Sequence, residues 1–247
     1  MPLTAKDKVL IWAHRGACAY APENTMEAFQ LAIDMNADGI EIDVHLSKDG
    51  HIMVIHDAKI DRTSNGQGAV TEYTLEELKV FDFGYKFYNG ERRGIKIPTL
   101  DELYELYSKT DMTINIEIKS ADPAIAQKLV ELTAKYGMTD RVIYSSFNHN
   151  QLLNIHKVDP TLPIAPLYGA TIVNVADYAS NMSASAVHPS QTLILEDPEY
   201  CADFAKRGIA VNPWTCNDPE VAKKLAALGA NAIITNVPDV MAEALRK

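Results

Sequence analysis

The chain has 247 residues, of which 47% are apolar and 23% are charged, and its formal net charge is −10. A chain this acidic is a poor ligand for a nucleic-acid backbone. Its longest apolar runs, of about five residues, are far shorter than the roughly 20 residues of a membrane-spanning helix. Cys18, Cys201 and Cys216 form no C-x-x-C pair, so neither a disulfide framework nor a cysteine zinc site is expected. The N-terminus lacks the apolar region of a signal peptide, and we expect a cytoplasmic protein.

Short β-branched runs alternate with longer helical patterns from one end of the chain to the other, which is typical of a parallel α/β fold. The predicted strands cover residues 9–13, 39–46, 113–119, 142–146, 164–167, 185–188, 209–214 and 232–235. The predicted helices cover residues 25–36, 100–109, 124–136, 148–157, 172–180, 198–206 and 219–227. We predict one TIM-type (β/α)8 barrel domain over residues 1–247, with an open doubly wound sheet as the alternative.

A ninth β-like run, residues 51–56, follows the second strand too closely to be its parallel neighbour. A parallel connection needs about a dozen residues or more, and here about four are available, including an Asp-Gly sequence that favours a hairpin. We therefore predict an extra antiparallel strand outside the eight. Counting outward from the turn places Asp43 opposite Val54. The same register brings His56 back beside Glu41.

Residues 57–98 interrupt the alternation with a long irregular segment. They hold six of the 19 aromatic residues and five of the 12 glycines of the chain. Long insertions in compact domains often form lids or binding loops. We predict a small inserted cap over the barrel mouth that governs substrate choice rather than bond breaking. The alternative is a packed surface excursion without a function of its own.

Polar residues follow the first predicted strand, at the end where barrel enzymes carry their chemistry. His14 can exchange a proton near neutral pH, and Arg15 offers a fork of donors suited to a phosphate; the alternative is a polar turn. Asn24 and Glu27 have the spacing of a capping box, so Asn24 is expected to cap the next helix. Glu23 is expected to orient Arg15 or His14, or to favour the helix N-terminus.

Acidic residues alternate along two of the predicted strands. Glu41 and Asp43 share one face of the second strand, and Glu117 and Lys119 share one face of the third. Inward-facing carboxylates are costly unless they are paired or bind a cation. With three acids against one lysine, we expect a divalent cation, Mg²⁺ or Ca²⁺, at Glu41, Asp43 and Glu117. The alternative is a buried ion-pair network neutralised by Lys119.

Two histidines beside a metal and an arginine are what acid–base cleavage of a phosphodiester requires. One of His14 and His56 would remove a proton from the attacking oxygen, and the other would protonate the leaving alkoxide. The metal and Arg15 would stabilise charge on the phosphoryl oxygens. The alternative for His56 is a strand-end histidine that is satisfied by Asp57.

Seven motifs in family-like order and spacing resemble the glycerophosphodiester phosphodiesterase family, across nearly the whole chain. They are H-R-G (14–16), P-E-N-T (22–25), E-I-D-V (41–44), K-D-G (48–50), V-I-H-D (54–57), E-I-K (117–119) and W-T-C-N (214–217). Each motif is short, and the specificity comes from the set.

This resemblance implies a phospholipase-C-like barrel with a small insertion and the hydrolysis of glycerophosphodiesters to glycerol 3-phosphate and an alcohol. It implies His14 and His56 as the acid–base pair, and Arg15 and Lys119 as phosphate contacts. It also implies that Glu41, Asp43 and Glu117 bind a divalent metal.

The C-terminal half resembles the family more loosely. Phe147 and Trp214 are expected to line the substrate pocket, with packing at the rim or in the core as the alternative, and the role of His188 stays open. A lysophospholipase-type phosphodiesterase is the main functional alternative. A non-catalytic protein that binds phosphate esters would be expected to lack a histidine or an acid, and none is missing. The preferred alcohol, the metal and the number of chains stay open.

Overall fold

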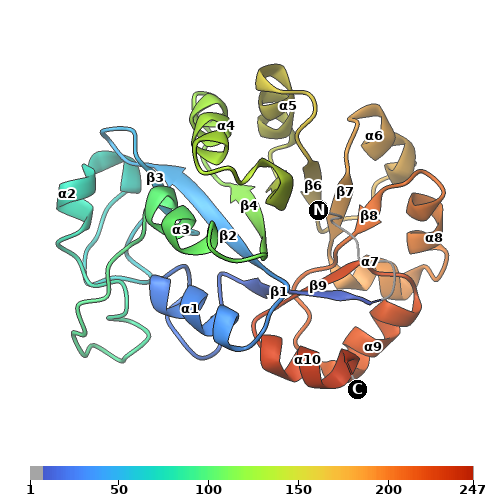
Figure 1. Cartoon of the computed structure of the whole chain (residues 1–247), viewed down its shortest axis with the longest axis horizontal. Coiled ribbons are helices and arrows are strands. Elements are labelled where there is room, and N and C mark those ends of the chain that lie inside the picture. The colour runs from blue at the N-terminus through green and yellow to red at the C-terminus, as the bar shows by residue number, and fades with distance from the viewer. Residues whose placement is uncertain (1–7, 247) are drawn as a thin grey trace.

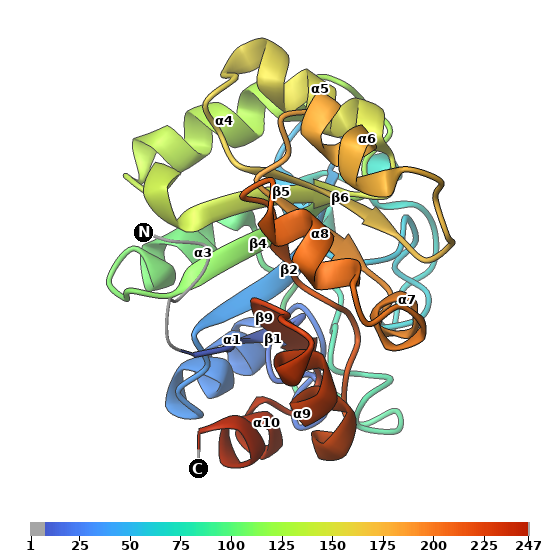
Figure 2. The ribbon, with the colours of Figure 1, turned by 90° about the vertical axis from the view of Figure 1, so that its right-hand side faces the viewer.

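Eight parallel strands form a barrel with helices around its outside (Figures 1 and 2), as predicted. This computed structural model describes residues 8–246, so the first seven residues of the N-terminal stretch considered above lie outside it. The strands of the barrel are β1 (Leu10–His14), β2 (Gly39–Leu46), β4 (Thr113–Ile118), β5 (Val142–Ser146), β6 (Ile164–Tyr168), β7 (Ala186–Pro189), β8 (Ala210–Val211) and β9 (Ala232–Thr235). Their order is β8-β7-β6-β5-β4-β2-β1-β9.

The barrel closes between β8 and β9 through backbone hydrogen bonds outside the regular ladder. The Asn231 N–H donates to the Val211 carbonyl at 2.8 Å, and the Ile234 N–H donates to the Pro213 carbonyl at 3.0 Å. β8 has two residues rather than the six predicted for 209–214. The Ile209 N–H donates to the Phe204 carbonyl instead of to a strand, whereas the Asn212 and Trp214 N–H groups still donate to the Val187 and Pro189 carbonyls of β7.

Nine helices of the described residues follow the strands or cover the barrel. They are α1 (Met26–Asp34), α3 (Leu100–Tyr107), α4 (Ile125–Lys135), α5 (His149–Val158), α6 (Val175–Asn181), α7 (Gln191–Glu196), α8 (Tyr200–Ala205), α9 (Pro219–Ala227) and α10 (Pro238–Leu245). The seven predicted helices are present within a few residues, and α7 and α10 were not predicted. No helix among residues 8–246 is long and apolar enough to cross a membrane.

Side chains alternate between the two faces of the barrel strands. Ile40, Ile42 and Val44 of β2 point outward and belong to the large apolar layer beneath the helices. A smaller cluster includes Trp12, with alanines contributed by several other strands. A single large indole surrounded by small residues fills space at close-packed density. The inward positions nearer the carboxyl ends of the strands are left for polar side chains.

The helix cap predicted at Asn24 is wrong. Thr25 caps α1, and its hydroxyl oxygen accepts a hydrogen bond from the Ala28 N–H at 3.3 Å. Asn24 has a φ of 55°, in the left-handed region that asparagine tolerates better than most residues. This backbone turn frees the Asn24 amide for a different contact, described below.

The predicted hairpin is present, but its register differs by one residue. β3 (Ile52–Val54) pairs antiparallel with β2, and Val54 lies opposite Val44 rather than opposite Asp43. The Ser47 N–H donates to the His51 carbonyl at 2.9 Å, which leaves a connection of three residues instead of four.

The last residue of this connection explains its length. Gly50 has a φ of +83°, as expected for the left-handed residue that ends a three-residue hairpin turn. The predicted pairing of His56 with Glu41 therefore fails, because β3 ends at Val54 and His56 lies in the following loop. His56 nevertheless lines the same cavity as Glu41.

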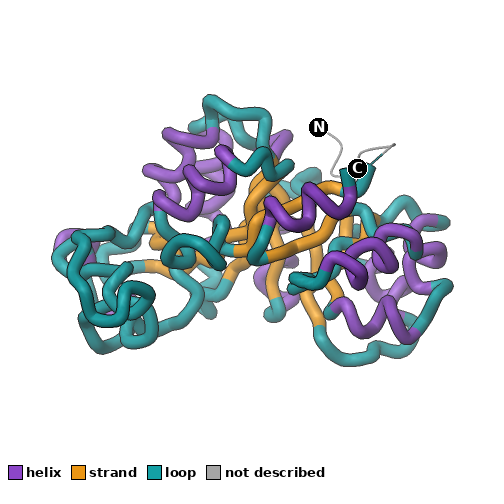
Figure 3. Tube along the Cα trace, turned by 90° about the horizontal axis from the view of Figure 1, so that it is seen from below, coloured by secondary structure: helices purple, strands orange, loops and turns teal. Residues whose placement is uncertain are grey.

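Residues 57–98 contain little regular structure. They include the 3₁₀ turn η1 (Val70–Glu72) and the short helix α2 (Leu75–Leu78), on the left of Figure 1. Figure 3 shows that this side of the molecule is mostly loop. Residues of this segment and of the hairpin form an apolar cluster separate from the barrel core: Met53, Ile55, Ile60, Val70, Leu78, Phe83 and Ile97.

Candidate active site

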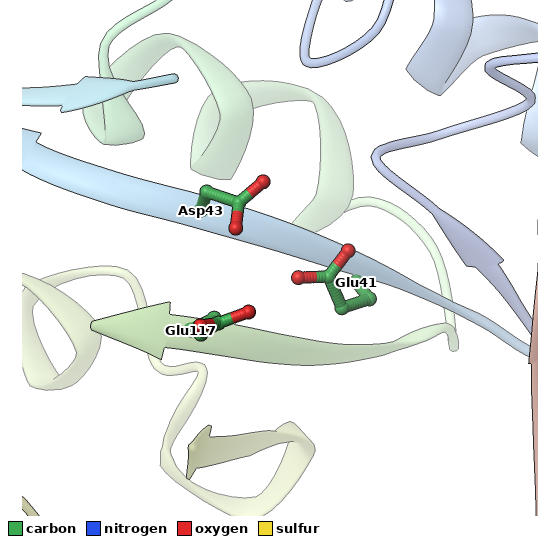
Figure 4. A group of neighbouring side chains, drawn as sticks. All are labelled: Glu41, Asp43 and Glu117. Carbon is green, nitrogen blue, oxygen red and sulfur yellow. The ribbon is translucent and has the colours of Figure 1, made fainter. Parts of the chain in front are cut away.

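Three buried carboxylates meet inside the barrel. Glu41 and Asp43 come from β2 and Glu117 from β4, with exposed fractions of 3%, 0% and 8%. The parallel register places Asp43 directly beside Glu117. One carboxylate oxygen from each residue lies within 4.8 Å of the others, and Figure 4 shows the three side chains turned toward one another.

Two cations, rather than the single lysine expected from the sequence, contact these acids. Arg15 Nε lies 3.3 Å from Asp43 Oδ2. Lys119 Nζ lies 2.6 Å from Glu117 Oε1 and 3.5 Å from Asp43 Oδ1. Three acids against two cations still leave an excess of negative charge.

The crowding of the acids shifts their pKa values in different directions. Burial, together with Asp43 and Glu117, raises the pKa of Glu41 well above its usual range. Burial and Asp43 also raise the pKa of Glu117 to about 7. Burial opposes ionisation of Asp43 as well, but Arg15 and other nearby cationic groups hold its pKa below the ordinary value. Without another cation, the cluster therefore retains protons near neutral pH.

The donor set fits a divalent cation. Within the described residues, no hydrogen bond reaches the buried atoms Glu41 Oε1 and Asp43 Oδ1. Lys119 contacts Asp43 Oδ1 and Glu117 Oε1, whereas no cation among residues 8–246 lies against Glu41 Oε1. Buried oxygens without partners are costly, and carboxylate oxygens are the preferred ligands of Mg²⁺ and Ca²⁺.

His14 lies beside the acidic cluster at the end of β1. Its Nε2 is 3.8 Å from Glu41 Oε2, and its Nδ1 is 2.7 Å from the side-chain oxygen of Asn236. An amide oxygen only accepts hydrogen bonds, so Nδ1 carries the proton and Nε2 has a free lone pair. Burial and the nearby Arg15 lower the pKa of His14 to about 4.

His56 has a different partner. Its Nδ1 lies 2.7 Å from Asp57 Oδ1, and because a carboxylate oxygen accepts, the Nδ1–H of the imidazole donates this hydrogen bond. A hydrogen bond from Arg62, followed by the contribution of His56, lowers the pKa of Asp57 to about 2. The contact with Asp57 that the alternative interpretation proposed is therefore present, and it leaves Nε2 of His56 available to a ligand.

The two residues predicted to support the site have specific contacts. The Asn24 amide donates to Asp43 Oδ2 at 2.9 Å, and its oxygen accepts a hydrogen bond from the Asp43 N–H at 3.4 Å. Glu23 Oε1 accepts a hydrogen bond from Arg15 Nη1 at 2.9 Å. Asn24 therefore orients an acid, and Glu23 orients the arginine.

Arg62 and Asn236 were missed by the sequence reasoning. Arg62 donates to both oxygens of Glu23 and to Asp57, with three of these contacts at 2.7 Å. No sequence pattern identifies it. Asn236 directly follows β9, and His14 is the last residue of β1, so both lie at the same end of their strands. This position at a strand end could have identified Asn236 as a candidate site residue.

Phe147 and Trp214 line one cavity with Glu41, Glu117 and both histidines. Its volume is about 100 Å³, and the two rings meet edge to face with centroids 5.4 Å apart. The Trp214 indole N–H donates to the His188 carbonyl at 2.8 Å. His188 is fully buried and does not line this cavity, and burial lowers the pKa of its imidazole to about 3.

Comparison with known proteins identifies the family. The sequence pattern of the "Glycerophosphoryl diester phosphodiesterase family" matches residues 14–240. The chain belongs to this family. It is 43% identical to a glycerophosphodiester phosphodiesterase of Caldanaerobacter subterraneus subsp. tengcongensis, over 97% of this chain and 99% of that protein. It is 38% identical to one from Bacillus altitudinis, over 93% and 95% of the two chains.

Solved structures agree with this membership. A phosphodiesterase of Oleispira antarctica, solved in complex with the product sn-glycerol-3-phosphate, superposes with a TM-score of 0.87 at 28% identity, over 96% of each chain. A glycerophosphodiester phosphodiesterase of Thermotoga maritima superposes with a TM-score of 0.80 at 29% identity, over 97% of this chain and 99% of that one. The resemblance predicted from the seven motifs is confirmed.

Proposed function

We propose that this enzyme hydrolyses glycerophosphodiesters to glycerol 3-phosphate and an alcohol, with one Mg²⁺ or Ca²⁺ held by Glu41, Asp43 and Glu117. The observation that carries the proposal is the group of three buried carboxylates beside two histidines and two cations, in which Glu41 Oε1 has neither a hydrogen bond nor an ion pair among the described residues. The product complex of the Oleispira relative supports the same substrate class.

The charged side chains around the acids would receive the phosphate. When bound, a divalent cation supplies charge that polarises the phosphoryl oxygens and offsets their developing negative charge. Arg15 and Lys119 present further donors to the same oxygens. Glu23 and Asn24 hold Arg15 and Asp43 in place through the contacts described above.

His14 and His56 take opposite proton-transfer roles. One removes the proton from the attacking oxygen, and the other protonates the departing alkoxide. Each ring has its Nδ1 proton committed, to Asn236 in one case and to Asp57 in the other. Both Nε2 atoms are therefore available for the reaction.

The remaining parts of the chain divide substrate recognition between them. Phe147 and Trp214 contact the glycerol moiety in the small cavity that they share with Glu41 and Glu117. The chain forms one barrel domain in which residues 57–98 act as a cap that influences the choice of substrate.

Glycerol 3-phosphate release from a panel of glycerophosphodiesters tests the proposal. We expect the purified protein, supplied with Mg²⁺ or Ca²⁺, to release glycerol 3-phosphate and the free alcohol. A protein that binds these diesters without turnover, with either cation, would contradict the proposed reaction.

A further inference from the structure

A second cavity adjoins the first at the catalytic residues. Its volume is about 410 Å³, and it lies between the barrel mouth and the 57–98 segment. The two cavities share only His14 and Arg15 among their described lining residues. Phe83, Lys86 and Phe87 of the 57–98 segment form part of the wall of the second cavity.

A phosphodiester carries two substituents on one phosphorus atom, and this geometry offers a separate place for each. With the phosphoryl group at Arg15, one substituent enters each cavity. The smaller cavity suits the three-carbon glycerol that every substrate of the class contains. The larger cavity is then left for the alcohol, which varies between substrates.

The charges along the larger cavity are not equally available. Arg62 is bound by Glu23 and Asp57, and Arg15 is bound by Glu23 and Asp43. Lys86 also lines the cavity, and among the described residues no carboxylate lies within ion-pair distance of its ammonium group. It is therefore the cation of this wall with a charge available to a ligand.

The backbone that carries Lys86 is held in a fixed shape. The buried carboxylate of Asp82 accepts hydrogen bonds from the N–H groups of Gly84, Arg93 and Gly94 at 2.6 to 2.9 Å. These bonds join both ends of the loop 84–94. Because the loop is constrained at its base, Lys86 and the half-exposed ring of Phe87 are held at the wall of the cavity.

We propose that this larger cavity is the alcohol subsite and that Lys86 makes it favour alcohols that carry a negative charge over alcohols that carry a positive one. The inference rests on the proposed glycerophosphodiester hydrolysis and adds the class of leaving alcohol. An anionic group would pair with the Lys86 ammonium, whereas a cationic group would be repelled by it. Phe83 and Phe87 would contact the carbon skeleton of the alcohol.

Three substrates on one scaffold test the charge preference. They are sn-glycero-3-phosphoethanolamine, with a cationic amine, its neutral N-acetyl derivative and its anionic N-succinyl derivative. We expect kcat/KM to rise in that order for the unmodified protein. A partly exposed charge pair is worth up to about a fivefold change, so Lys86→Met should lower the anionic-to-cationic ratio by about fivefold. Lys86→Glu should lower it further and Lys86→Arg should retain it.

Matched controls separate the possible failures. Lys59→Met removes a lysine from the same segment but outside the cavity, and the ratio should stay unchanged. A ratio that does not respond to Lys86→Met or Lys86→Glu, while all three diesters are hydrolysed, would overturn the subsite assignment alone. Absence of glycerol 3-phosphate release from all three by the unmodified protein would instead overturn the proposed function.

Discussion

The barrel and the 57–98 segment hold their functional side chains by different means. Glu41, Asp43 and Glu117 project from neighbouring strands whose backbones are hydrogen-bonded to each other residue by residue. The 57–98 segment lacks such a ladder, and its loop 84–94 depends on the Asp82 carboxylate. The acids proposed to share one cation are therefore on the rigid part of the molecule, and the wall proposed to face a variable alcohol is on loops.

Arg62 nevertheless links functional side chains of the two regions. Arg62 belongs to the irregular segment, but it binds Glu23, which orients Arg15, and Asp57, which orients His56. A strict division, in which the segment affects only substrate choice, does not allow for these contacts.

Removal of divalent cations should lower the catalytic rate more than any other change, and it acts on the acids of the barrel rather than on the 57–98 segment. A bound cation contributes several kcal/mol to phosphoryl transfer, so we expect chelation to lower kcat by roughly 10⁴-fold. Glu41→Gln should cause a comparable loss and weaken cation binding measured by calorimetry. Glu105→Gln, on the exposed face of α3, is the matched control. Full activity after exhaustive chelation would remove the cation from the mechanism.

Replacing either histidine should have the next largest effect. General acid–base help is worth about 10²–10⁴ in rate, so His14→Ala and His56→Ala should each lose that much on a natural diester. His51→Ala, in the exposed hairpin turn, should lose little. A 4-nitrophenyl ester of glycerol 3-phosphate needs no proton to release its alcohol, so the variant that recovers on this substrate lacks the acid. Equal loss by both variants on both substrates would contradict the division of roles.

The sequence predicted those features that depend on local periodicity. The strands at 39–46, 142–146 and 232–235 have the predicted bounds, because alternating β-branched residues report directly on a buried strand. The same alternation placed Glu41 and Asp43 on the inner face of the barrel.

Features set by turn geometry or by distant contacts could not be predicted in this way. A hairpin turn one residue shorter than expected shifted the whole β3 register. The backbone at Asn24 turns this side chain toward Asp43 and leaves the helix cap to Thr25. Arg62 meets Glu23 across 39 residues of sequence, a separation at which no periodic pattern operates.

Arg62→Met tests the joint between the two regions. The change leaves Glu23 and Asp57 without their shared cation, so Arg15 and His56 lose part of their orientation. We expect kcat to fall by about tenfold, since misplacement of positioned groups slows a reaction without removing them. Arg62→Lys should recover only part of the loss because lysine lacks the planar fork of donors. Arg92→Met, which removes another exposed cation of the same segment, is the control. An unchanged kcat in Arg62→Met would mean that the 57–98 segment affects only substrate choice and not bond breaking.

Loss of the Asp82 carboxylate should have the smallest effect on the catalytic rate. Its effect should be confined to the loop that this carboxylate holds. Burial alone would raise the pKa of Asp82, but the backbone N–H groups bonded to it hold the pKa below its ordinary value. The stabilisation that comes from the charged form is therefore complete above the unfolded pKa of 3.8, and it is lost as the pH falls through the lower folded value.

Asp82→Asn removes this charge at every pH, at a local cost of about 1–3 kcal/mol. Amide hydrogen exchange of peptides covering 82–95, corrected for intrinsic rates, should accelerate at neutral pH in Asp82→Asn. In the unmodified protein it should accelerate only on acidification. The strands that carry the three acids should keep their protection, and the exposed control Glu91→Gln should behave as the unmodified protein. If amide exchange of β2 and β4 accelerates equally in Asp82→Asn, the segment and the barrel unfold together. The two regions would then differ in secondary structure but not in local stability.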